Sequence, residues 1–304
     1  MPVAVVPEGL DGLRADLGAA RMFGVTRTRV EAAAEREDLR LDGVPIGKSA
    51  RLRAGGLLEV NLEEPPAVSF RPELVAGLTV VYDDADILVV DKPAGIAAHP
   101  GLGWGGGSVV EHLTAAGYQL ATLGPADRPG VVSRLDVGTS GLMVLAKSDL
   151  GYVSLQTAFR ERAVTKIYHA LVQGYPDPDE GTIESPIGHA RTDEWKMTVT
   201  PSGRPAVTHY RLIRRAFRTS LLEVRLETGR THQIRVHMAA IRHPCVGDRL
   251  YGADPRLAAE TGLDRQWLHA AELGFAHPRT GEPMTFTSAY PEDLAHALAV
   301  VTAL

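Results

Sequence analysis

The sequence predicts an α+β fold in which a mixed, largely antiparallel sheet carries most of the chain. Short segments rich in Val, Ile and Leu recur along it and are bounded by Gly, Pro and Asp, which is typical of strands. Several of these segments are separated by turns too short to hold a crossover helix, and this favours antiparallel neighbours. The chain has 304 residues, 44% of them hydrophobic and 23% charged, which is an ordinary composition for a globular protein.

The length favours a large domain with a small companion, and the order of the patterns places the small one first. Residues 1–65 read as a small α/β unit. The stretch EEPPAVSFRPEL follows, and because its prolines disfavour helix and sheet interior alike, we predict a linker over 66–78. The main domain is expected at 79–304. Within the leading unit we expect helices at 14–24 and 26–36 and short strands around 39–43 and 57–64.

In the main domain, one helix can be placed from its capping pattern. Ser108 and Glu111 form a capping box, which opens a helix that ends near Gly117. The strand candidates are LTVVYDD, DILVVDK, GLMVLAK, KIYHALVQG, AVTHYRLIRR and SLLEVRLE.

A second helix is expected in THQIRVHMAAI, over 231–241. Thr231 is the predicted N-cap. Arg235 and His232 lie off the apolar stripe of this helix, which leaves both free to face a cleft. The stripe consists of Ile234, Met238 and Ile241.

No apolar run approaches the roughly 20 residues needed to cross a bilayer, so we expect no membrane partner. The opening MPVAVVPEGLDGLRADL lacks the charged start and long apolar stretch of a secretory signal. The single cysteine, Cys245, cannot form an internal disulfide. A cytoplasmic protein is therefore expected. A monomer is favoured, because the sequence has no coiled-coil pattern or long apolar stripe that demands a partner subunit.

The net charge of −5 argues at first against a polyanionic partner. Between Arg204 and Arg249, however, the chain holds ten arginines against three acidic residues. This segment predicts either a positive surface on an acidic protein or a solvated face with ordinary ion pairs.

Three motifs suggest a dinucleotide site, a serine hydrolase and a metal site, and each departs from the sequence pattern that such a site needs. GLGWGG at 101–106 matches a dinucleotide fingerprint, but no strand leads into it, so we expect a loop. Ser140 in GTSGL resembles a nucleophile elbow, yet it leads into a strand instead of a helix. A group of possible metal ligands lacks the helical i, i+4 spacing, and no metal is expected. These are His232, His237, His243 and Cys245.

Asp136 is the fourth candidate, in SRLDVGTSGLMVLAKS. An aspartate before a glycine-rich turn often caps that turn through a backbone N–H. Three further residues favour catalysis instead. Arg134 lies two positions earlier, and Tyr168 and Arg235 come from later elements whose ends can converge with it.

Long runs of the main domain resemble, in order, the motifs of the pseudouridine synthase family that acts on large-subunit ribosomal RNA and on tRNA. The resemblance covers roughly 79–289, and the leading unit is similar, more weakly, to an S4 RNA-binding domain. The matching runs are DDADILVVDKPAGIAAHP, RLDVGTSGLMVLAKS, AVTKIYHALVQG, LETGRTHQIRVHMAAIRHPCVGDRLYG and WLHAAELGFAHPRTGEPMTF.

The resemblance implies a catalytic role for three residues and no cofactor or metal. Asp136 is the aspartate of the R-L-D motif, Tyr168 the tyrosine of K-x-Y, and Arg235 the arginine of H-Q-I-R. Such enzymes break the N-glycosidic bond of uridine, turn the base and rejoin it through carbon. An ionised carboxylate suits this reaction. We expect the planar fork of Arg235 to hold that carboxylate, and the ring of Tyr168 to stack on uracil, with a hydroxyl that assists proton removal at C5.

Because a stacked uridine must be flipped out of the RNA, Arg134 is expected to enter the vacated space or hold phosphates. The arginine-rich segment would supply further backbone contacts. The family usually has a histidine before R-L-D, whereas this chain has Ser133, so any RNA contact of that histidine is weakened or replaced. Further RNA-binding candidates are Lys166, Arg230, His232 and Gln233.

The sequence thus predicts an RNA pseudouridine synthase with an S4-like leading domain. Large-subunit ribosomal RNA is the favoured substrate, because family members with such a leader commonly act there. Alternatives are tRNA as substrate, a non-catalytic RNA-binding or ribosome-assembly factor on the same fold, and a hydrolase using Ser140. The leading unit holds nine Lys or Arg against eleven Asp or Glu up to Pro65, so its RNA binding is expected to be modest.

Overall fold

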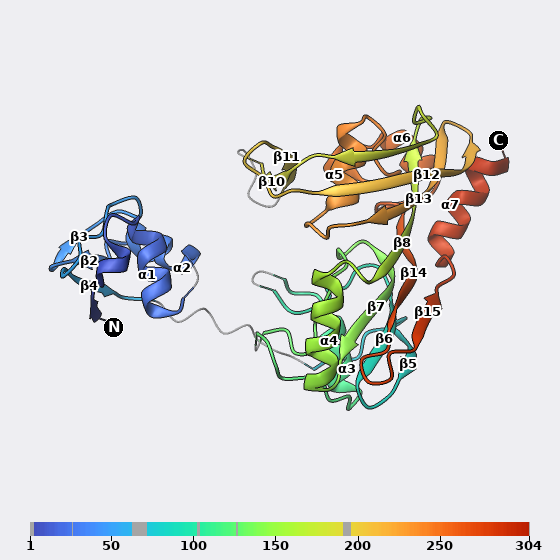
Figure 1. Ribbon diagram of the computed structural model, residues 1–304. Coiled ribbons are helices and arrows are strands. Elements are labelled where there is room, and N and C mark those ends of the chain that lie inside the picture. Colours follow the sequence, from blue (N-terminus) through green and yellow to red (C-terminus); the bar gives the residue numbers. More distant parts are fainter. Residues whose placement is uncertain are drawn as a thin grey trace. The chain divides into compact units, whose positions relative to one another are not determined.

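The computed structural model describes residues 3–25, 27–62, 72–101, 104–125, 127–190 and 196–303. The chain divides into two compact units, Met1–Ala67 and Val68–Leu304 (Figure 1). Much of the predicted linker, 66–71, lies outside the described residues. No helix in the described ranges is both long and apolar enough to cross a membrane.

The small unit packs two helices against an antiparallel sheet whose strand order is β1-β4-β2-β3. Both predicted helices are present, and Gly24, in the left-handed conformation with φ 64°, ends the first. A buried carboxylate, Asp16, bonds to Arg14 and Arg27 and so ties the two helices together. The elements are β1 (Val3–Val5), η1 (Glu8–Leu10), α1 (Ala15–Phe23), α2 (Arg27–Glu35), β2 (Leu39–Leu41), β3 (Val44–Pro45) and β4 (Leu57–Val60).

The large unit is built on a nine-stranded sheet, as far as the chain is described, with the order β5-β6-β7-β14-β8-β13-β12-β9 and with β15 beside β14 (Figure 1). Only the β7–β14 pair is parallel, so the predicted mixed, largely antiparallel α+β architecture is confirmed. The strands are β5 (Thr79–Asp83), β6 (Ile87–Lys92), β7 (Ser140–Ala146), β8 (Thr165–Gln173), β9 (Glu180–Glu184), β12 (Val207–Ala216), β13 (Thr219–Leu226), β14 (Leu268–Ala276) and β15 (Pro283–Thr287); β10 (Ile187–His189) and β11 (Met197–Val199) form a separate pair.

The predicted capping box is confirmed. The Ser108 hydroxyl accepts a hydrogen bond from the Glu111 backbone N–H at 3.2 Å and donates one to the Glu111 carboxylate at 2.8 Å. The helices and 3₁₀ turns are α3 (Val109–Ala115), α4 (Asp149–Arg160), α5 (Gln233–Ala240), η2 (Arg249–Tyr251), α6 (Pro255–Glu260) and α7 (Glu292–Ala303).

The second predicted helix exists as α5, but its predicted cap is wrong. The helix begins at Gln233, after His232 in the left-handed conformation with φ 56°, and Thr231 does not cap it. The turn is closed instead by the Gln233 side chain, which accepts a hydrogen bond from the Arg230 backbone N–H at 3.0 Å. The apolar stripe packs as predicted, because Ile234 and Met238 are buried and Ile241 lies against the same cluster.

Strand alternation decides which side chains meet which helix. On β8, Tyr168, Ala170 and Val172 belong to the cluster that α5 covers, whereas Leu171 packs with α7. Leu135, which precedes Asp136, packs against both the α5 cluster and the neighbouring α3 cluster. The loop that carries the R-L-D motif is therefore anchored in two parts of the core.

The glycines after Asp136 are required by close packing. A Cβ atom at Gly141 would lie 2.3 Å from the carbonyl oxygen of Ala270, where β7 meets β14. One at Gly138 would lie 2.5 Å from the Gln266 side chain. At Gly141, where the neighbouring atoms are backbone, any larger residue would push β7 away from β14, whereas at Gly138 the Gln266 side chain would have to move.

Candidate active site

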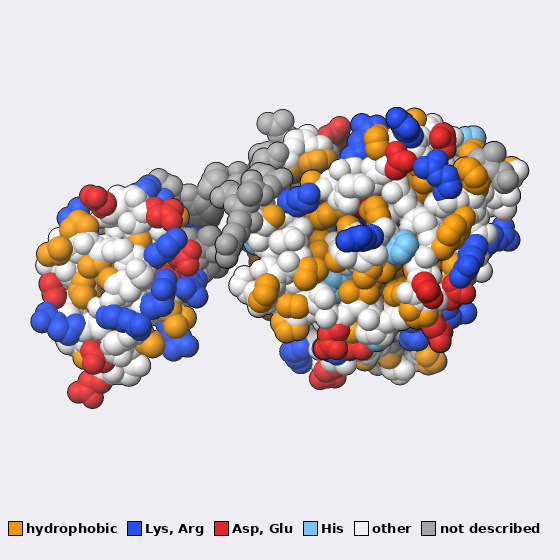
Figure 2. Space-filling model, turned by 90° about the horizontal axis from the view of Figure 1, so that it is seen from above, with side chains coloured by type: hydrophobic (Ala, Val, Ile, Leu, Met, Phe, Trp, Pro, Cys, Tyr) orange, Lys and Arg blue, Asp and Glu red, His pale blue; other side chains and the backbone are white. Residues whose placement is uncertain are grey.

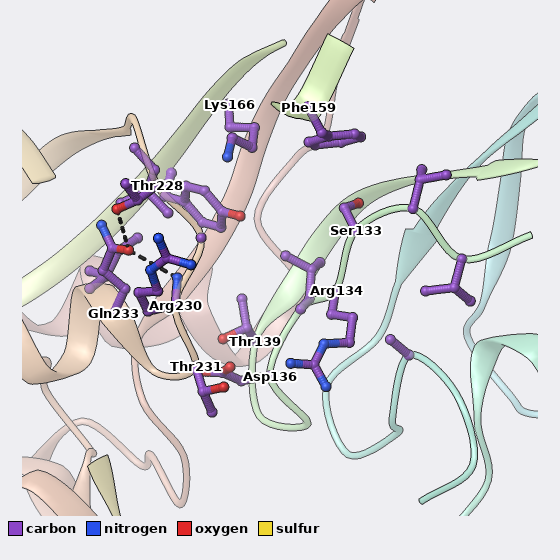
Figure 3. Close-up of a pocket in the computed structure, with 18 of the residues that line it drawn as sticks. Ser133, Arg134, Asp136, Thr139, Phe159, Lys166, Thr228, Arg230, Thr231 and Gln233 are labelled. Atoms are coloured by element: carbon purple, nitrogen blue, oxygen red, sulfur yellow. Dashed lines mark hydrogen bonds between the residues drawn. The ribbon is translucent and has the colours of Figure 1, made fainter. Parts of the chain in front are cut away.

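A cavity of about 910 Å³ lies beside the R-L-D loop. It is bordered by that loop, by the segment that leads into α5, by the end of α4 and by β8 (Figure 3). Asp136, Tyr168, Arg134 and Lys166 all line it, so residues far apart in the sequence meet in one place.

The backbone around Asp136 is held by a buried lysine. Lys92, at the end of β6, is fully buried, and its ammonium donates to the carbonyl oxygens of Pro93, Ile96 and Val137 at 2.9, 3.0 and 3.3 Å. Burial lowers the pKa of Lys92 to about 7, although the charge of Asp136 works in the opposite direction. This lysine therefore fixes the position of the peptide that follows the aspartate.

The Asp136 carboxylate points to Arg235 and does not cap its own turn in the described structure. Arg235 Nη1 donates to Asp136 Oδ2 at 3.3 Å, which brings helix α5 and the R-L-D loop together. The side chain of Asp136 is 22% exposed, so its carboxylate remains open to the cavity.

The paired hydrogen bonds expected between Arg235 and Asp136 are made to a different aspartate. Arg235 Nε and Nη2 donate to the two oxygens of Asp248 at 2.7 and 2.9 Å. The side chain of Asp248 is 1% exposed, and it also accepts a hydrogen bond from the backbone N–H of Tyr251. Asp136 thus receives one N–H from a guanidinium that Asp248 orients.

The ring of Tyr251 also supports this guanidinium. The Arg235 guanidinium carbon lies 4.9 Å from the Tyr251 ring centroid. Burial alone would lower the pKa of Arg235, but its bonds to Asp248 outweigh that effect and raise the pKa. The arginine is therefore charged at any pH at which the protein is folded. The sequence analysis did not single out Asp248, although this residue lies in GDRLYG, at the end of the matching run that contains α5.

Tyr168 lies on β8, on the wall of the same cavity. Its side chain is largely buried, and burial together with the charge of Asp136 raises the pKa of its hydroxyl. The phenol thus stays protonated at neutral pH. Within the described residues its hydroxyl has no hydrogen-bond partner, which leaves it available to a ligand.

The five expected RNA contacts are placed differently from one another. Arg134 is exposed at the cavity and pairs with none of the described residues, and Lys166 is half-buried there. Arg230 donates from Nε to the Pro205 carbonyl. His232 bonds through Nδ1 to the Tyr251 hydroxyl at 2.8 Å.

Gln233 is the exception, because its amide is used inside the protein. The oxygen accepts from Thr228 Oγ1 and the Arg230 backbone N–H (Figure 3). The nitrogen donates to Val207 O and Thr208 Oγ1. These bonds shape the loop before α5, and the expected RNA contact of Gln233, which also lines the cavity, stays a prediction.

The alternative chemistries find no support in the geometry. Ser140 is buried at the start of strand β7, where its hydroxyl bonds to His269 Nδ1 at 3.0 Å, and it forms no elbow before a helix. His237 is buried and bonds to Thr208 and Ser185. The ranges that the structure describes contain no cluster of three or more His, Cys, Asp or Glu that could hold a metal. Within GLGWGG, residues 102–103 lie outside the described residues.

Several arginines of the arginine-rich segment form ordinary ion pairs, which is one of the two readings that its sequence left open. Arg211, Arg215 and Arg218 form ion pairs with acidic residues, as Arg235 does. On the face in view, Figure 2 shows Lys and Arg interspersed with Asp and Glu, without one continuous basic surface. Arg134 and Lys166, which lie outside this segment, line the cavity and form no ion pair with a described residue.

Comparison with known proteins gives one consistent result. The family model described as RNA pseudouridylate synthase matches residues 86–240. An uncharacterized RNA pseudouridine synthase of Mycobacterium bovis is 54% identical over 297 residues, covering 97% of this chain and 96% of the relative. The ribosomal large subunit pseudouridine synthase D of Xanthomonas campestris is 40% identical over 308 residues, covering 98% and 92%. Among solved structures, human RNA pseudouridylate synthase domain containing 1 matches with a TM-score of 0.58 and 28% identity, over 75% of this chain and 87% of that one.

Proposed function

Because the chain belongs to the RNA pseudouridine synthase family and is therefore an isomerase, we propose that it converts specific uridines of large-subunit ribosomal RNA to pseudouridine, with Asp136 as the catalytic carboxylate. The observation that carries the assignment of the residue is the position of Asp136 at the wall of the cavity. Its carboxylate is partly exposed there, accepts a hydrogen bond from the buried Arg235, and shares the cavity with Tyr168.

The geometry gives each of these groups a distinct task. The carboxylate of Asp136 attacks the anomeric carbon of the flipped uridine or removes a proton near it, and both routes require the ionised form. Arg235 stabilises that form through one N–H bond. Because Asp248 fixes the guanidinium, the carboxylate is oriented before the substrate arrives.

We propose a narrower role for Tyr168 than the sequence suggested. Since its pKa is raised, the hydroxyl is a poor base for the proton at C5 of the rotated uracil. We assign it to stacking on the base and to hydrogen-bond donation. We assign removal of the C5 proton to Asp136. Once the sugar is bonded to C5 of the base, the Asp136 carboxylate is no longer needed at the anomeric carbon and is free to act as a base.

Large-subunit ribosomal RNA is proposed as substrate because the relative from Xanthomonas carries that name and is similar along nearly its whole length. We propose the leading unit as an S4-like RNA-binding module, supported by its compact two-helix and four-strand build. A monomer in the cytoplasm is proposed for the whole chain, and the free, buried Cys245 fits a reducing compartment.

Release of tritium from RNA made with C5-tritiated uridine tests the proposed reaction. The reaction replaces that hydrogen by a bond to the sugar, so an isomerase releases tritium to water in proportion to turnover. The purified protein is expected to release it from an unmodified large-subunit transcript and to leave a tRNA transcript unchanged. Binding without release would identify a non-catalytic RNA-binding protein, and release from the tRNA alone would overturn the choice of substrate.

A further inference from the structure

Lys166 is a half-buried cation on the cavity wall to which no described residue offers an acceptor. It makes no hydrogen bond and no ion pair within the described part of the chain. Burial lowers the pKa of its ammonium, and no charged neighbour counters this effect. The nearby Arg160 and Arg162 differ, because they pair with Glu161 and Glu227. An ammonium partly removed from water and left unpaired destabilises the protein that carries it, so a ligand oxygen is the group that would compensate it.

An aromatic ring lies beside this ammonium. The centroid of the Phe159 ring is 5.7 Å from Lys166 Nζ, and Phe159 is half-buried at the end of α4, where it lines the same cavity. A ring that accepts a stacked base and a cation that neutralises a phosphate are the two parts with which proteins hold single-stranded nucleotides.

This pair is separated from the catalytic carboxylate. Figure 3 shows Phe159 and Lys166 at one end of the pocket and Asp136 with Thr231 at the other, with Ser133 between them. The cavity volume of about 910 Å³ is near the upper end of the roughly 300–1,000 Å³ typical of pockets for drug-sized ligands.

We propose that Lys166 and Phe159 form a subsite for a second nucleotide, adjacent to the target uridine in the RNA, whose base stacks on Phe159 and whose phosphate accepts a hydrogen bond from Lys166. This inference rests on the proposed function, because it takes the occupant of the cavity to be RNA. It also explains why the chain keeps an unpaired, half-buried ammonium, since the energetic cost in the free protein is offset when RNA binds.

The first test is Lys166→Met in the full chain, with an unmodified large-subunit ribosomal RNA transcript as the probe. Loss of one phosphate contact predicts roughly 10-fold weaker binding and a decrease of about 0.7 to 0.9 in the slope of log K against log salt. Because the ammonium has no hydrogen-bond or ion-pair partner among the described residues, and only its contact with the Phe159 ring is lost, the melting temperature without RNA should change little.

Lys147→Met is the matched control. Lys147 is also partly buried, with 20% exposure, but it forms an ion pair with Asp83 and donates to the carbonyl oxygen of Asp84. This variant should melt at a lower temperature and bind RNA with unchanged affinity and salt slope. A structural role for Lys166 would make the two variants behave alike, and that result would overturn the proposal.

Phe159→Leu tests the stacking half of the subsite. Base stacking predicts a loss of affinity of about 5-fold to 150-fold without a change in salt slope, because no charge is removed. If Lys166→Met weakens binding with an unchanged slope, the phosphate assignment is wrong. Unchanged affinity in both variants would show that this end of the cavity does not hold RNA. Tritium release by the unaltered protein from the same transcript reports separately on the proposed function. The phosphate contacts can be measured by RNA binding even if no tritium is released.

Discussion

Asp248→Asn separates the orientation of the catalytic pair from RNA binding. Arg235 makes three hydrogen bonds to carboxylates, and two of them, at 2.7 and 2.9 Å, go to Asp248. An asparagine can accept only one of these and turns an N–H against the other. The third bond, at 3.3 Å to Asp136, is the longest of the set and depends on the guanidinium staying in place.

The expected loss in turnover follows from this geometry. A shift of about 1 Å in a catalytic contact costs about 100-fold in rate, or roughly 2.7 kcal/mol of transition-state stabilisation. The KM for RNA should stay within about 2-fold, because the Asp248 side chain is 1% exposed and cannot reach a ligand. Breaking a buried ion pair also costs about 3–5 kcal/mol of stability. The assay, single-turnover tritium release at saturating RNA, is therefore run at about 15 °C, near the usual temperature of maximum stability.

A double-mutant cycle with Arg235→Lys distinguishes orientation from general damage. If Asp248 acts through Arg235, the second substitution adds little to the first, and the rate losses are strongly non-additive. A folded Asp248→Asn variant with the turnover of the unaltered protein would refute the reasoning. Fully additive losses would do so as well, since they would mean that the two residues act independently.

Two further predictions concern stability and the leading unit. Lys92 has a pKa of about 7 in the folded protein against an ordinary 10.5, so between these values the unfolded chain binds the proton and the folded chain does not. The free energy of unfolding should accordingly increase as pH rises from about 7 to 10.5. Lys92→Met should remove that increase, and equal melting-temperature gains between pH 7 and 9 in both proteins would contradict it. Removal of 1–67 should weaken binding to structured RNA by roughly 10-fold or more while turnover at saturating RNA changes little; unchanged affinity in a titration would show that this unit is not an RNA module.

Local patterns predicted the elements that are stabilised by local contacts. The capping box of Ser108 is such a case, because both partners lie within one turn of the chain. Helix α4 was not predicted, since Gly151 and β-branched Val153 lower its helix propensity. It forms because Tyr152 and Leu155 are buried against the sheet, and Ser148 caps it.

The same distinction holds for the candidate active site, where motifs predicted individual residues but not the contacts that depend on tertiary packing. Asp136, Tyr168 and Arg235 were predicted as site residues from their motifs, and the structure brings Arg235 to Asp136 from 99 residues away in the sequence. The pairing of Arg235 with Asp248 could not be predicted, because it depends on how η2 packs against α5. The left-handed His232, which sets where α5 begins, was missed for a similar reason, since nothing in its neighbours demands that conformation.

The most direct test of the central claim compares Asp136→Asn with the unaltered protein in tritium release and RNA binding on the same transcript. Asparagine keeps the shape of the side chain and can still accept a hydrogen bond from Arg235, but it has no ionisable carboxylate. We expect tritium release to become undetectable while RNA affinity stays within a few-fold. Substantial release by this variant would contradict the assignment of Asp136 as the catalytic group.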